Sequence, residues 1–452
     1  MGNKVALHNL GCKVNAYEIE AMQQLLEEAG YEIVPFEPGA DIYVINTCTV
    51  TNIADRKSRQ MLHKAKKMNP EAIVVATGCY VQTGGEKLEK DEAIDLVLGN
   101  NQKINIVEAL AEYAENKPGH GSHVIKINQT KEYEELSIDH TAEHVRAYIK
   151  VQDGCNQFCT YCIIPYARGR VRSRNIESVL KEVRALAEKG YKEVVLTGIH
   201  LSSYGMEHRE GGPVQGGNWD HGPLLDLIER IHRIPGLERI RLGSLEPRII
   251  TEEFAGALAG LAKFCPHFHL SLQSGCDATL KRMNRHYTTE DYLRRCGILR
   301  KWFDHPAITT DVIVGFPGET QEEFEITREF LKKVHFYEMH VFKYSKRAGT
   351  RAAVMPDQVP EQVKGRRSDV LLELEASMSR EYREHFIGSS VWVLFEDMAE
   401  VEGRKYIIGH TPQYVKAALA VKDGEENRLS GQILCLKAAG LLGGDLLEVG
   451  WQ

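Results

Sequence analysis

The amino-acid sequence predicts an α/β protein built of three parts. These are an N-terminal α/β domain with a parallel sheet, a partial barrel of six β-α units, and a small antiparallel β-barrel of the OB-like type. Strand-like and helix-like segments alternate along most of the chain, and short β segments replace this alternation beyond Gly388. A chain of 452 residues is also long enough to build several hydrophobic cores.

Composition and charge indicate a globular protein of the cytoplasm. The residues are 43% hydrophobic and 26% charged, which is ordinary for a soluble domain. No stretch approaches the ~18 apolar residues of a membrane helix, and the start, Met-Gly-Asn-Lys, begins a strand and not a signal peptide. We therefore expect a cytoplasmic protein without a membrane partner. In that compartment ten cysteines favour metal or redox chemistry over disulfides.

Residues 1–115 are predicted to form the N-terminal parallel-sheet domain. Helical apolar spacing over Asn15–Ala29 stops at Gly30, a suitable C-terminal cap, and Asn52–Met68 reads as a second helix that Asn69-Pro70 ends. Hydrophobic runs outside these helices predict strands at Val5–Leu10, Asp41–Asn46 and Ala72–Ala76. Residues 116–140 are charged and contain Pro and Gly, so we expect a linker there.

Residues 141–367 are predicted to form the partial barrel. Amphipathic helices such as Ile176–Glu188 and Leu224–Ile234 separate the strands, and Gly205–Gly222 is expected to be an irregular loop without assigned chemistry. The site of such a barrel gathers at the carboxyl ends of its strands. The six strand candidates are Val145–Val151, Glu193–Thr197, Arg239–Leu242, Phe268–Leu272, Thr309–Val314 and Glu338–Phe342.

Residues 368–452 are predicted to hold a connecting helix and the C-terminal barrel. Met355–Arg367 contains Pro and charges and is expected to be a connector, and the helix follows from about Ser368 to Phe386. Five short β segments then predict the small barrel, a class that includes nucleic-acid binders. They are Val391–Glu396, Lys405–Gly409, Tyr414–Val421, Gln432–Lys437 and Leu446–Val449.

Six of the ten cysteines form two groups of three at the ends of predicted strands. Cys155, Cys159 and Cys162 make a Cys-x3-Cys-x2-Cys run, and Cys12, Cys48 and Cys79 each close a β-type segment. The carboxyl ends of parallel strands meet at one edge, so three separate thiolates can converge there. Three ligands leave one iron of a cubane open, so the sequence predicts two open iron–sulfur sites.

A structural zinc site is the alternative interpretation of the closely spaced run. Such a site normally has four protein ligands, but the next cysteine after Cys162 is Cys265. Cys265, Cys276, Cys296 and Cys435 have no partners at useful spacing and are expected to be buried structural thiols. The histidines show no ligand cluster. His200 and His269 lie near strand ends and are expected only to line the cavity.

Four basic runs stand out against a net charge of −7, which argues mildly against indiscriminate nucleic-acid binding. Two of the runs adjoin proposed site segments, and we interpret these as phosphate contacts. The four runs are Arg56–Lys67, Arg168–Arg174, Lys281–His286 and Lys343–Arg351.

The cysteine motifs carry a family resemblance. A Cys-x3-Cys-x-aromatic-Cys run after the first strand of a partial barrel resembles radical S-adenosylmethionine (SAM) enzymes. The longer stretch GCNQFCTYCIIPYARGRVRSR, with NLGCKVNAYE, INTCTVTNIADRKSR and ATGC upstream, is similar to the methylthiotransferases. The resemblance covers the whole chain and implies a methylthiotransferase domain, a radical SAM barrel and a TRAM domain. GCKVN around Cys12 resembles the branch that acts on threonylcarbamoyladenosine in tRNA.

The resemblance implies two 4Fe–4S clusters and SAM as cofactors. The cluster on Cys155, Cys159 and Cys162 would bind and cleave SAM, and the resulting radical would take hydrogen from C2 of adenine. The cluster on Cys12, Cys48 and Cys79 would donate sulfur, and a second SAM would methylate it. The implied reaction converts N6-threonylcarbamoyladenosine, 3′ of the anticodon, to 2-methylthio-N6-threonylcarbamoyladenosine. The implied partners are the tRNA anticodon stem-loop and an electron donor of the flavodoxin or ferredoxin type.

The same resemblance assigns further contacts. Arg56, Lys57 and Arg59 would meet phosphates of the anticodon loop, and Tyr414 and Lys416, with Tyr406 as a further aromatic, would bind RNA from the C-terminal barrel. Packing within that barrel explains the two tyrosines equally well. For each SAM contact, a plain strand end with turn residues is the alternative. The SAM contacts would be Tyr161, Thr197, Gly198, Ser244, Glu246, Gln273, Val314 and Gly315.

Four other functions stay open at this point. One relative of the family acts on N6-isopentenyladenosine in tRNA, and a more distant one modifies a ribosomal-protein aspartate. A non-catalytic RNA-binding protein with structural zinc would also explain cysteines beside a small barrel. A different radical SAM maturase with an auxiliary cluster would explain the cysteines but not the TRAM-like barrel.

Overall fold

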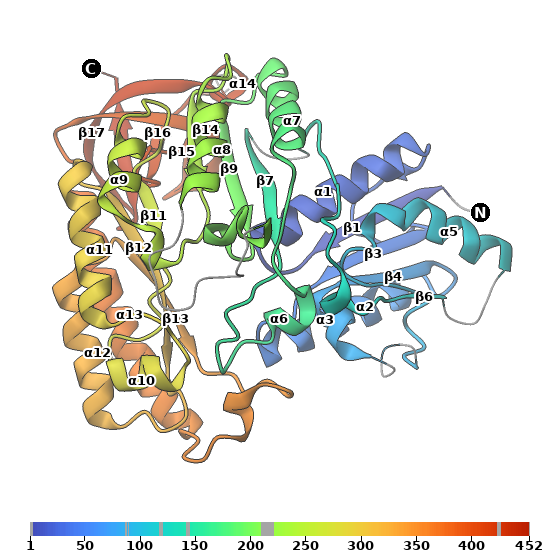
Figure 1. The fold of residues 1–452 in the computed structure, drawn as a ribbon. Helices are drawn as coiled ribbons and strands as arrows, with labels where there is room; N and C mark the ends of the chain where they lie inside the picture. The colour runs from blue at the N-terminus through green and yellow to red at the C-terminus, as the bar shows by residue number, and fades with distance from the viewer. Residues whose placement is uncertain are drawn as a thin grey trace.

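A computed structural model describes residues 3–85, 88, 90–116, 121–141, 145–208, 221–422 and 426–451. Figure 1 shows the N-terminal domain in blue beside the green-to-orange barrel, with the C-terminal barrel in red at one end. The three predicted parts are confirmed. Within the described residues, no helix is long and apolar enough to cross a membrane.

The N-terminal domain is a six-stranded parallel sheet in the order β2-β1-β3-β4-β5-β6. Helices α1 and α5 cover one face, and α2 and α3 cover the other. The helices are α1 (Lys13–Glu28), α2 (Asn52–Met68), α3 (Cys79–Gly84), α5 (Ile106–Asn116) and the 3-10 turn η1 (Lys103–Asn105). The strands are β1 (Lys4–Asn9), β2 (Glu32–Ile33), β3 (Ile42–Thr47), β4 (Ile73–Gly78), β5 (Leu96–Leu98) and β6 (Gly121–His123).

The stretch predicted as a linker is largely structured where it is described. Its strand β6 pairs with β5 and extends the N-terminal sheet. A 3-10 turn, η2 (Ile127–Gln129), follows. Leu136 and Ile138 are buried in the core of the second domain. The sequence does not predict this burial, because Leu136 and Ile138 are two apolar residues within a largely charged stretch.

The second domain has the six parallel strands that the sequence predicts. Two sheets, β10-β9-β7 and β11-β12-β13, are joined by isolated bridges between Ile240 and Phe264 and between Leu245 and Leu270. A short strand, β8, pairs antiparallel with β7 at the edge. The strands are β7 (Arg146–Asp153), β8 (Arg172–Ser173), β9 (Glu193–Gly198), β10 (Arg239–Leu242), β11 (His267–His269), β12 (Ala307–Val314) and β13 (Glu338–Lys343).

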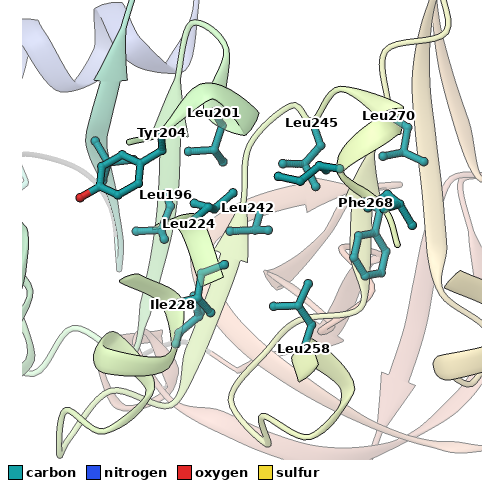
Figure 2. Packing of buried hydrophobic residues seen from close by; sticks show 14 of the residues in the cluster. Leu196, Leu201, Tyr204, Leu224, Ile228, Leu242, Leu245, Leu258, Phe268 and Leu270 are labelled. Atoms are coloured by element: carbon teal, nitrogen blue, oxygen red, sulfur yellow. The ribbon is translucent and has the colours of Figure 1, made fainter. Parts of the chain in front are cut away.

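Alternate residues of the barrel strands face the helices and the barrel interior. Leu196 and Leu242 pack against the helix residues Leu224 and Ile228, as Figure 2 shows. Because side chains alternate along a strand, their neighbours point into the barrel. The helices are α6 (Ile164–Arg168), α7 (Ile176–Glu188), α8 (Gly222–His232), α9 (Glu252–Ala259), α10 (Asp277–Arg282), α11 (Thr289–Trp302) and α12 (Gln321–Val334).

Short 3-10 turns fill several connections of this domain. In the predicted loop Gly205–Gly222, residues 209–220 lie outside the described residues. The turns are η3 (Leu201–Ser203), η4 (Met206–His208), η5 (Pro247–Ile249) and η6 (Arg351–Val354).

The connecting helix α13 (Glu361–Glu384) begins earlier than the sequence predicts. The predicted connector contains Lys364 and Arg367, which are buried: Lys364 Nζ donates to the carbonyl of Tyr344 at 3.1 Å, and Arg367 pairs with Glu319 at 2.7 Å. These contacts stabilise a first helical turn that charge patterning alone suggests is exposed.

The C-terminal domain is a closed five-stranded barrel in the order β14-β15-β16-β18-β17. All neighbouring strands are antiparallel except β16 and β18, which run parallel. The strands are β14 (Ser390–Val401), β15 (Arg404–His410), β16 (Lys416–Ala420), β17 (Ile433–Leu442) and β18 (Leu446–Gly450), with a short helix α14 (Glu426–Leu429).

The C-terminal barrel contacts the amino ends of the strands of the second domain. Arg239, at the start of β10, donates to the carbonyls of His410 at 2.8 Å and Trp392 at 3.0 Å. Arg146, at the start of β7, pairs with Glu396 at 3.0 Å. This end lies opposite the strand ends that carry the cysteine loop.

A buried ion network joins the N-terminal domain to the second domain. Glu18 of α1 pairs with Arg168 of α6, with Lys150 of β7 at 2.7 Å and with Lys103 at 3.1 Å, and all four side chains are fully buried. Asp153 pairs with Lys150 at 2.7 Å. Three cations around one carboxylate fix how α1 lies against β7.

Replacing Glu18 with Ala is expected to destabilise the protein strongly. The change leaves three buried cations without this carboxylate, which typically costs about 3–5 kcal/mol. Glu27→Ala is the matched control, because Glu27 lies on the same helix and makes only partly exposed contacts, with His140 at 3.6 Å and with Gln23 at 2.9 Å. Thermal unfolding should show a large drop for Glu18→Ala and little change for Glu27→Ala. Equal shifts in the two variants would contradict this role.

The same network gives a pH dependence with a defined sign. Its cations hold the pKa of Glu18 well below the ordinary value of 4.5, with Arg168 the largest stabilising influence against the desolvation that burial imposes. Such a group adds stability above its unfolded pKa, and this stability is lost as pH falls toward the folded value. Glu18→Gln should therefore lower the unfolding temperature of the cluster-free protein at pH 7, and the difference should shrink below pH ~4.5. A difference that grows on acidification would be inconsistent.

Candidate active site

The loop after β7 brings Cys155, Cys159 and Cys162 together. The amide of Cys155 donates to the carbonyl of Gly169 at 3.0 Å, and the amide of Cys162 donates to the carbonyl of Cys159 at 3.0 Å. These bonds curl the loop so that its three thiols influence one another electrostatically. The convergence that the sequence predicts for this trio is present.

The far side of the barrel mouth anchors the middle of this loop. The amide of Thr160 donates to the carbonyl of Met283 at 3.0 Å, and its hydroxyl donates to the carbonyl of Arg282 at 2.9 Å. The carbonyl of Thr160 accepts from the amide of Ala352 at 2.8 Å. Segments after β11 and β13 therefore hold a loop that begins at β7, which keeps it in one place.

The electrostatics of this trio suit a metal centre. Burial raises the pKa of Cys155 to about 12, with Cys159 adding to the shift. Burial and both neighbouring thiols raise the pKa of Cys162 as well. Three thiolates this close are stable only beside compensating positive charge, which iron supplies. Arg285 adds a further positive group, because its Nη1 donates to Cys159 Sγ at 3.4 Å.

The second trio, Cys12, Cys48 and Cys79, converges at the carboxyl ends of β1, β3 and β4. Gly11 has a φ of +112°, and a Cβ there would lie 3.1 Å from Cys48 Sγ. This close approach requires glycine at position 11. Cys79 opens α3 directly after β4. Cys79 adds to the raised pKa of Cys12, and Cys79 and Cys12 add to that of Cys48, so the three thiols lie near one another.

Buried polar groups surround the second trio. Arg168 Nε donates to Cys79 Sγ at 3.1 Å, and Asn100 Nδ2 donates to the same sulfur at 3.6 Å. Burial raises the pKa of Cys48 to about 11, and the other two thiols add to that shift. Three soft thiolates, of which Cys48 and Cys79 are buried and Cys12 is exposed, fit an iron–sulfur cluster that is open on one side. The donors to Cys79 are the kind of groups that tune one.

One short helix connects the two trios. α6 is five residues long and starts just after the loop of Cys162. Its last residue, Arg168, contacts Cys79 of the other trio. The two cysteine sets are therefore held on the same side of the barrel through a single rigid element.

The residues expected to contact SAM lie in differing environments. Tyr161 packs edge-on against Phe316, with ring centroids 6.4 Å apart, and Thr197 and Gly198 end β9 as predicted. Ser244 is exposed, whereas the buried Glu246 carboxylate accepts from Arg248 Nε at 2.7 Å.

The other residues of this group lie at the ends of β11 and β12. Gln273 adopts a positive φ of 72° and bridges to β12. The Val314 side chain belongs to the core that packs on the helices, so only its backbone can face the interior. The amide of Gly315 donates to Glu319 at 2.6 Å. Their contacts with SAM stay a prediction.

The residues expected to bind RNA divide into exposed and enclosed ones. Arg56, Lys57 and Arg59 lie exposed on α2, and Lys416 is exposed on β16. Tyr406 is only 2% exposed and packs with Ala418 and Leu442 in a small cluster of the C-terminal domain, so the expectation that it stacks on bases is wrong. Tyr414 is half-buried against His410, with ring centroids 4.5 Å apart.

Two basic runs serve the protein's own structure. Arg168, Arg172 and Arg174 are buried in ion pairs, so the interpretation of this run as phosphate contacts is wrong for these three. Arg347, in the run after β13, donates to Thr49 at 2.7 Å and pairs with Asp55 at 2.8 Å. This second run ties the barrel to the loop beyond Cys48.

Three further residues meet that sequence reasoning did not combine. His269, Asp311 and His340 place one ligand atom each within 4.8 Å of one another. They lie on β11, β12 and β13, on the faces that point into the barrel. Two imidazoles and a carboxylate can hold a divalent cation. The expectation that the histidines show no ligand cluster is wrong at this place, because only strand register brings the three together.

Comparisons with known proteins agree with this geometry. Residues 4–99 match the family described as "Uncharacterized protein family UPF0004", and residues 149–331 match the radical SAM superfamily. The radical SAM methyltransferase TsrM of Kitasatospora setae, solved with cobalamin and a 4Fe–4S cluster, has a similar fold. Its TM-score is 0.58 at 19% identity, and the match covers 78% of this chain and 77% of that one.

Curated relatives extend over nearly the whole chain. A Bacillus subtilis (strain 168) protein named threonylcarbamoyladenosine tRNA methylthiotransferase MtaB is 42% identical, over 96% of this chain and 93% of its own. A protein of the same name from Aquifex aeolicus is 41% identical over 89% and 95%. An Acetivibrio thermocellus protein named tRNA-2-methylthio-N(6)-dimethylallyladenosine synthase is 35% identical over 88% and 82%.

Iron content tests the two trios independently. Anaerobically reconstituted protein should hold about eight irons per chain, as expected for two cubanes. Cys155→Ala and Cys48→Ala should each lower this to about four, because each removes a ligand of a different cluster. Cys276→Ala is the control, since this thiol belongs to neither trio. Zinc instead of iron, or loss of all iron from every trio variant, would speak against two separate clusters.

Proposed function

We propose that this chain, which belongs to the family of radical SAM tRNA methylthiotransferases, acts on N6-threonylcarbamoyladenosine 3′ of the tRNA anticodon. The product would be 2-methylthio-N6-threonylcarbamoyladenosine. The observation that carries the proposal is the pair of cysteine trios held by α6 on one side of a six-stranded barrel. The near full-length similarity to two threonylcarbamoyladenosine tRNA methylthiotransferases supports the choice of nucleoside.

The residues of the two trios would have separate tasks. Bound there, the two clusters and SAM supply reductive SAM cleavage, sulfur and a methyl group. Cys155, Cys159 and Cys162 would hold the SAM-binding cluster, and Cys12, Cys48 and Cys79 the sulfur-donating one. The barrel would exclude water and hold the adenine so that its C2 atom lies between the two sites.

Neighbouring donors would tune these clusters. A hydrogen bond to a ligand sulfur lowers its electron density and changes the cluster's reduction potential. Arg285 would act in this way at Cys159 and Arg168 at Cys79, through the contacts described above. Each trio has its own guanidinium, so the two potentials can be set independently.

The remaining contacts are proposed from position. Thr197, Gly198, Gln273 and the backbone at Val314 lie at or near the carboxyl ends of barrel strands and would bind SAM, together with Tyr161. Arg56, Lys57 and Arg59 would bind phosphates of the anticodon loop near the second trio. Lys416 would extend this contact from the C-terminal barrel. An electron donor of the flavodoxin or ferredoxin type would reduce the first cluster in the cytoplasm.

Mass spectrometry of tRNA nucleosides tests the assignment. The reconstituted enzyme, given SAM and a reductant, should methylthiolate a stem-loop carrying N6-threonylcarbamoyladenosine and leave one carrying N6-isopentenyladenosine unchanged. Cys48→Ala is the matched control, which should still cleave SAM but form no methylthio product. Methylthiolation of the isopentenyl stem-loop alone would show that the chain belongs functionally with the other branch.

A further inference from the structure

Three cationic side chains share one aromatic ring at the floor of the barrel. The guanidinium of Arg241 lies 4.7 Å from the ring centroid of Tyr414, that of Arg146 lies 5.1 Å away, and Lys13 Nζ lies 5.8 Å away. Tyr414 belongs to the C-terminal domain, the two arginines to the barrel strands, and Lys13 to the N-terminal domain. All three domains therefore meet at this ring.

The strand residues of this cluster face the barrel interior. Ile240 and Leu242, the neighbours of Arg241, pack in the core toward the helices, as does Ala147 beside Arg146. Their side chains and those of Arg241 and Arg146 therefore point to opposite faces. Lys13 opens α1 and reaches the same interior from the N-terminal domain.

Positive charge exceeds negative charge here. Glu193 pairs with Arg241 at 2.8 Å and lies 3.7 Å from Arg239. Glu396 pairs with Arg146 at 3.0 Å. Four cations, including Lys13, thus face two carboxylates that are already paired with arginines. Glu20, the next carboxylate along α1, lies about two turns further on, beside Tyr148.

Lys13 is the cation left without an anion. Among the residues that the structure describes, no carboxylate lies within ion-pair distance of its Nζ. The Lys13 ammonium shares the Tyr414 ring with the guanidinium groups of Arg241 and Arg146, so its near neighbours there are cations. His267 and His410, which also face the cluster, have lowered pKa values because of burial. A half-buried ammonium among like charges is unfavourable unless an anion joins it.

The position of Lys13 connects this charge to the reaction. It directly follows Cys12, one of the three ligands of the proposed sulfur-donating cluster. A nucleobase whose C2 atom reaches that cluster would carry its N6 substituent into the neighbouring interior. Under the proposed function, the N6 substituent is a threonylcarbamoyl group, which ends in a carboxylate.

We propose that Lys13, with Arg146 and Arg241 behind it, binds the carboxylate of the substrate's threonylcarbamoyl group and so selects the modified nucleoside. This inference rests on the proposed function and adds a specificity-determining residue to it. An apolar N6 group would leave the ammonium unpaired in the same place, which costs binding energy. The cluster would therefore favour an acidic side chain and disfavour an isopentenyl one.

Paired ligands and variants test this site. Stem-loops carrying N6-threonylcarbamoyladenosine, or its threoninamide analogue without the carboxylate charge, would be titrated anaerobically into reconstituted enzyme and followed by fluorescence anisotropy. Wild type should bind the carboxylate form roughly 10- to 100-fold more tightly than the amide, as expected for a hydrogen bond to a charged group. Lys13→Met should bind the two equally, and Lys13→Arg should keep most of the preference.

A matched control separates this effect from general charge. Lys301→Met also removes one lysine, which pairs with Glu252 at 2.9 Å on the far surface helix α11. It should behave as wild type. Iron content and SAM cleavage check that each variant is folded and loaded. If Lys13→Met fails to load, the wild-type comparison of the two ligands and Lys13→Arg still decide.

The outcomes distinguish this inference from the proposed function. Equal binding of both ligands by wild type, or an unchanged preference in Lys13→Met, overturns the inference, even if the enzyme methylthiolates the acidic nucleoside. That second result would show that another group of the protein recognises the carboxylate. A Lys13-dependent preference without methylthiolation supports the binding site and counts against the proposed reaction.

Discussion

The structure depends on the carboxylate of Glu18 and the three cations around it. These charges lie where water cannot reach them, and a buried charge is tolerated only when its partners are in place. The network therefore does not need to add net stability to be important. It penalises every arrangement of α1 and β7 other than the observed one, because any displacement exposes a cation to an apolar core.

Arg168 extends this constraint to the chemistry. Its guanidinium contacts Glu18 and Asn15 of the N-terminal domain, and its Nε reaches Cys79. The residue stands at the end of the helix that follows the first cysteine loop. A shift of that loop would therefore break contacts with the second trio. In the proposed reaction both sites act on the same nucleobase, and one side chain links them.

The convergence of the cysteines could be predicted from the sequence because each group follows the end of a strand. Cys12, Cys48 and Cys79 follow strands of one parallel sheet, so their convergence follows from the alternation of strands and helices alone. The loop of Cys155 follows the first barrel strand for the same reason. Both predictions hold because backbone topology, and not side-chain detail, brings these positions together.

The contacts that could not be predicted from the sequence join residues that lie far apart in the chain. The run around Arg168 looks like a phosphate-binding stretch, but its main partner, Glu18, lies 150 residues away. His269, Asp311 and His340 come from three strands whose register no local pattern reveals. Tyr414 is an aromatic residue of a small barrel, which suggests stacking on RNA bases, yet Arg146 and Arg241 of the second domain lie against its ring. Local charge indicates that a partner exists and does not say which one.

The adjacency of Cys12 and Lys13 gives the clearest link between architecture and selectivity. A single peptide unit separates Cys12, a ligand of the proposed sulfur-donating cluster, from Lys13, the proposed contact of the N6 side chain, so the two cannot move independently. A substrate held by its carboxylate at Lys13 would present its ring at a fixed offset from Cys12. Selection of the substrate and placement of its reacting carbon would then be the same binding event, which is how a barrel can position a reactive species without a separate recognition step.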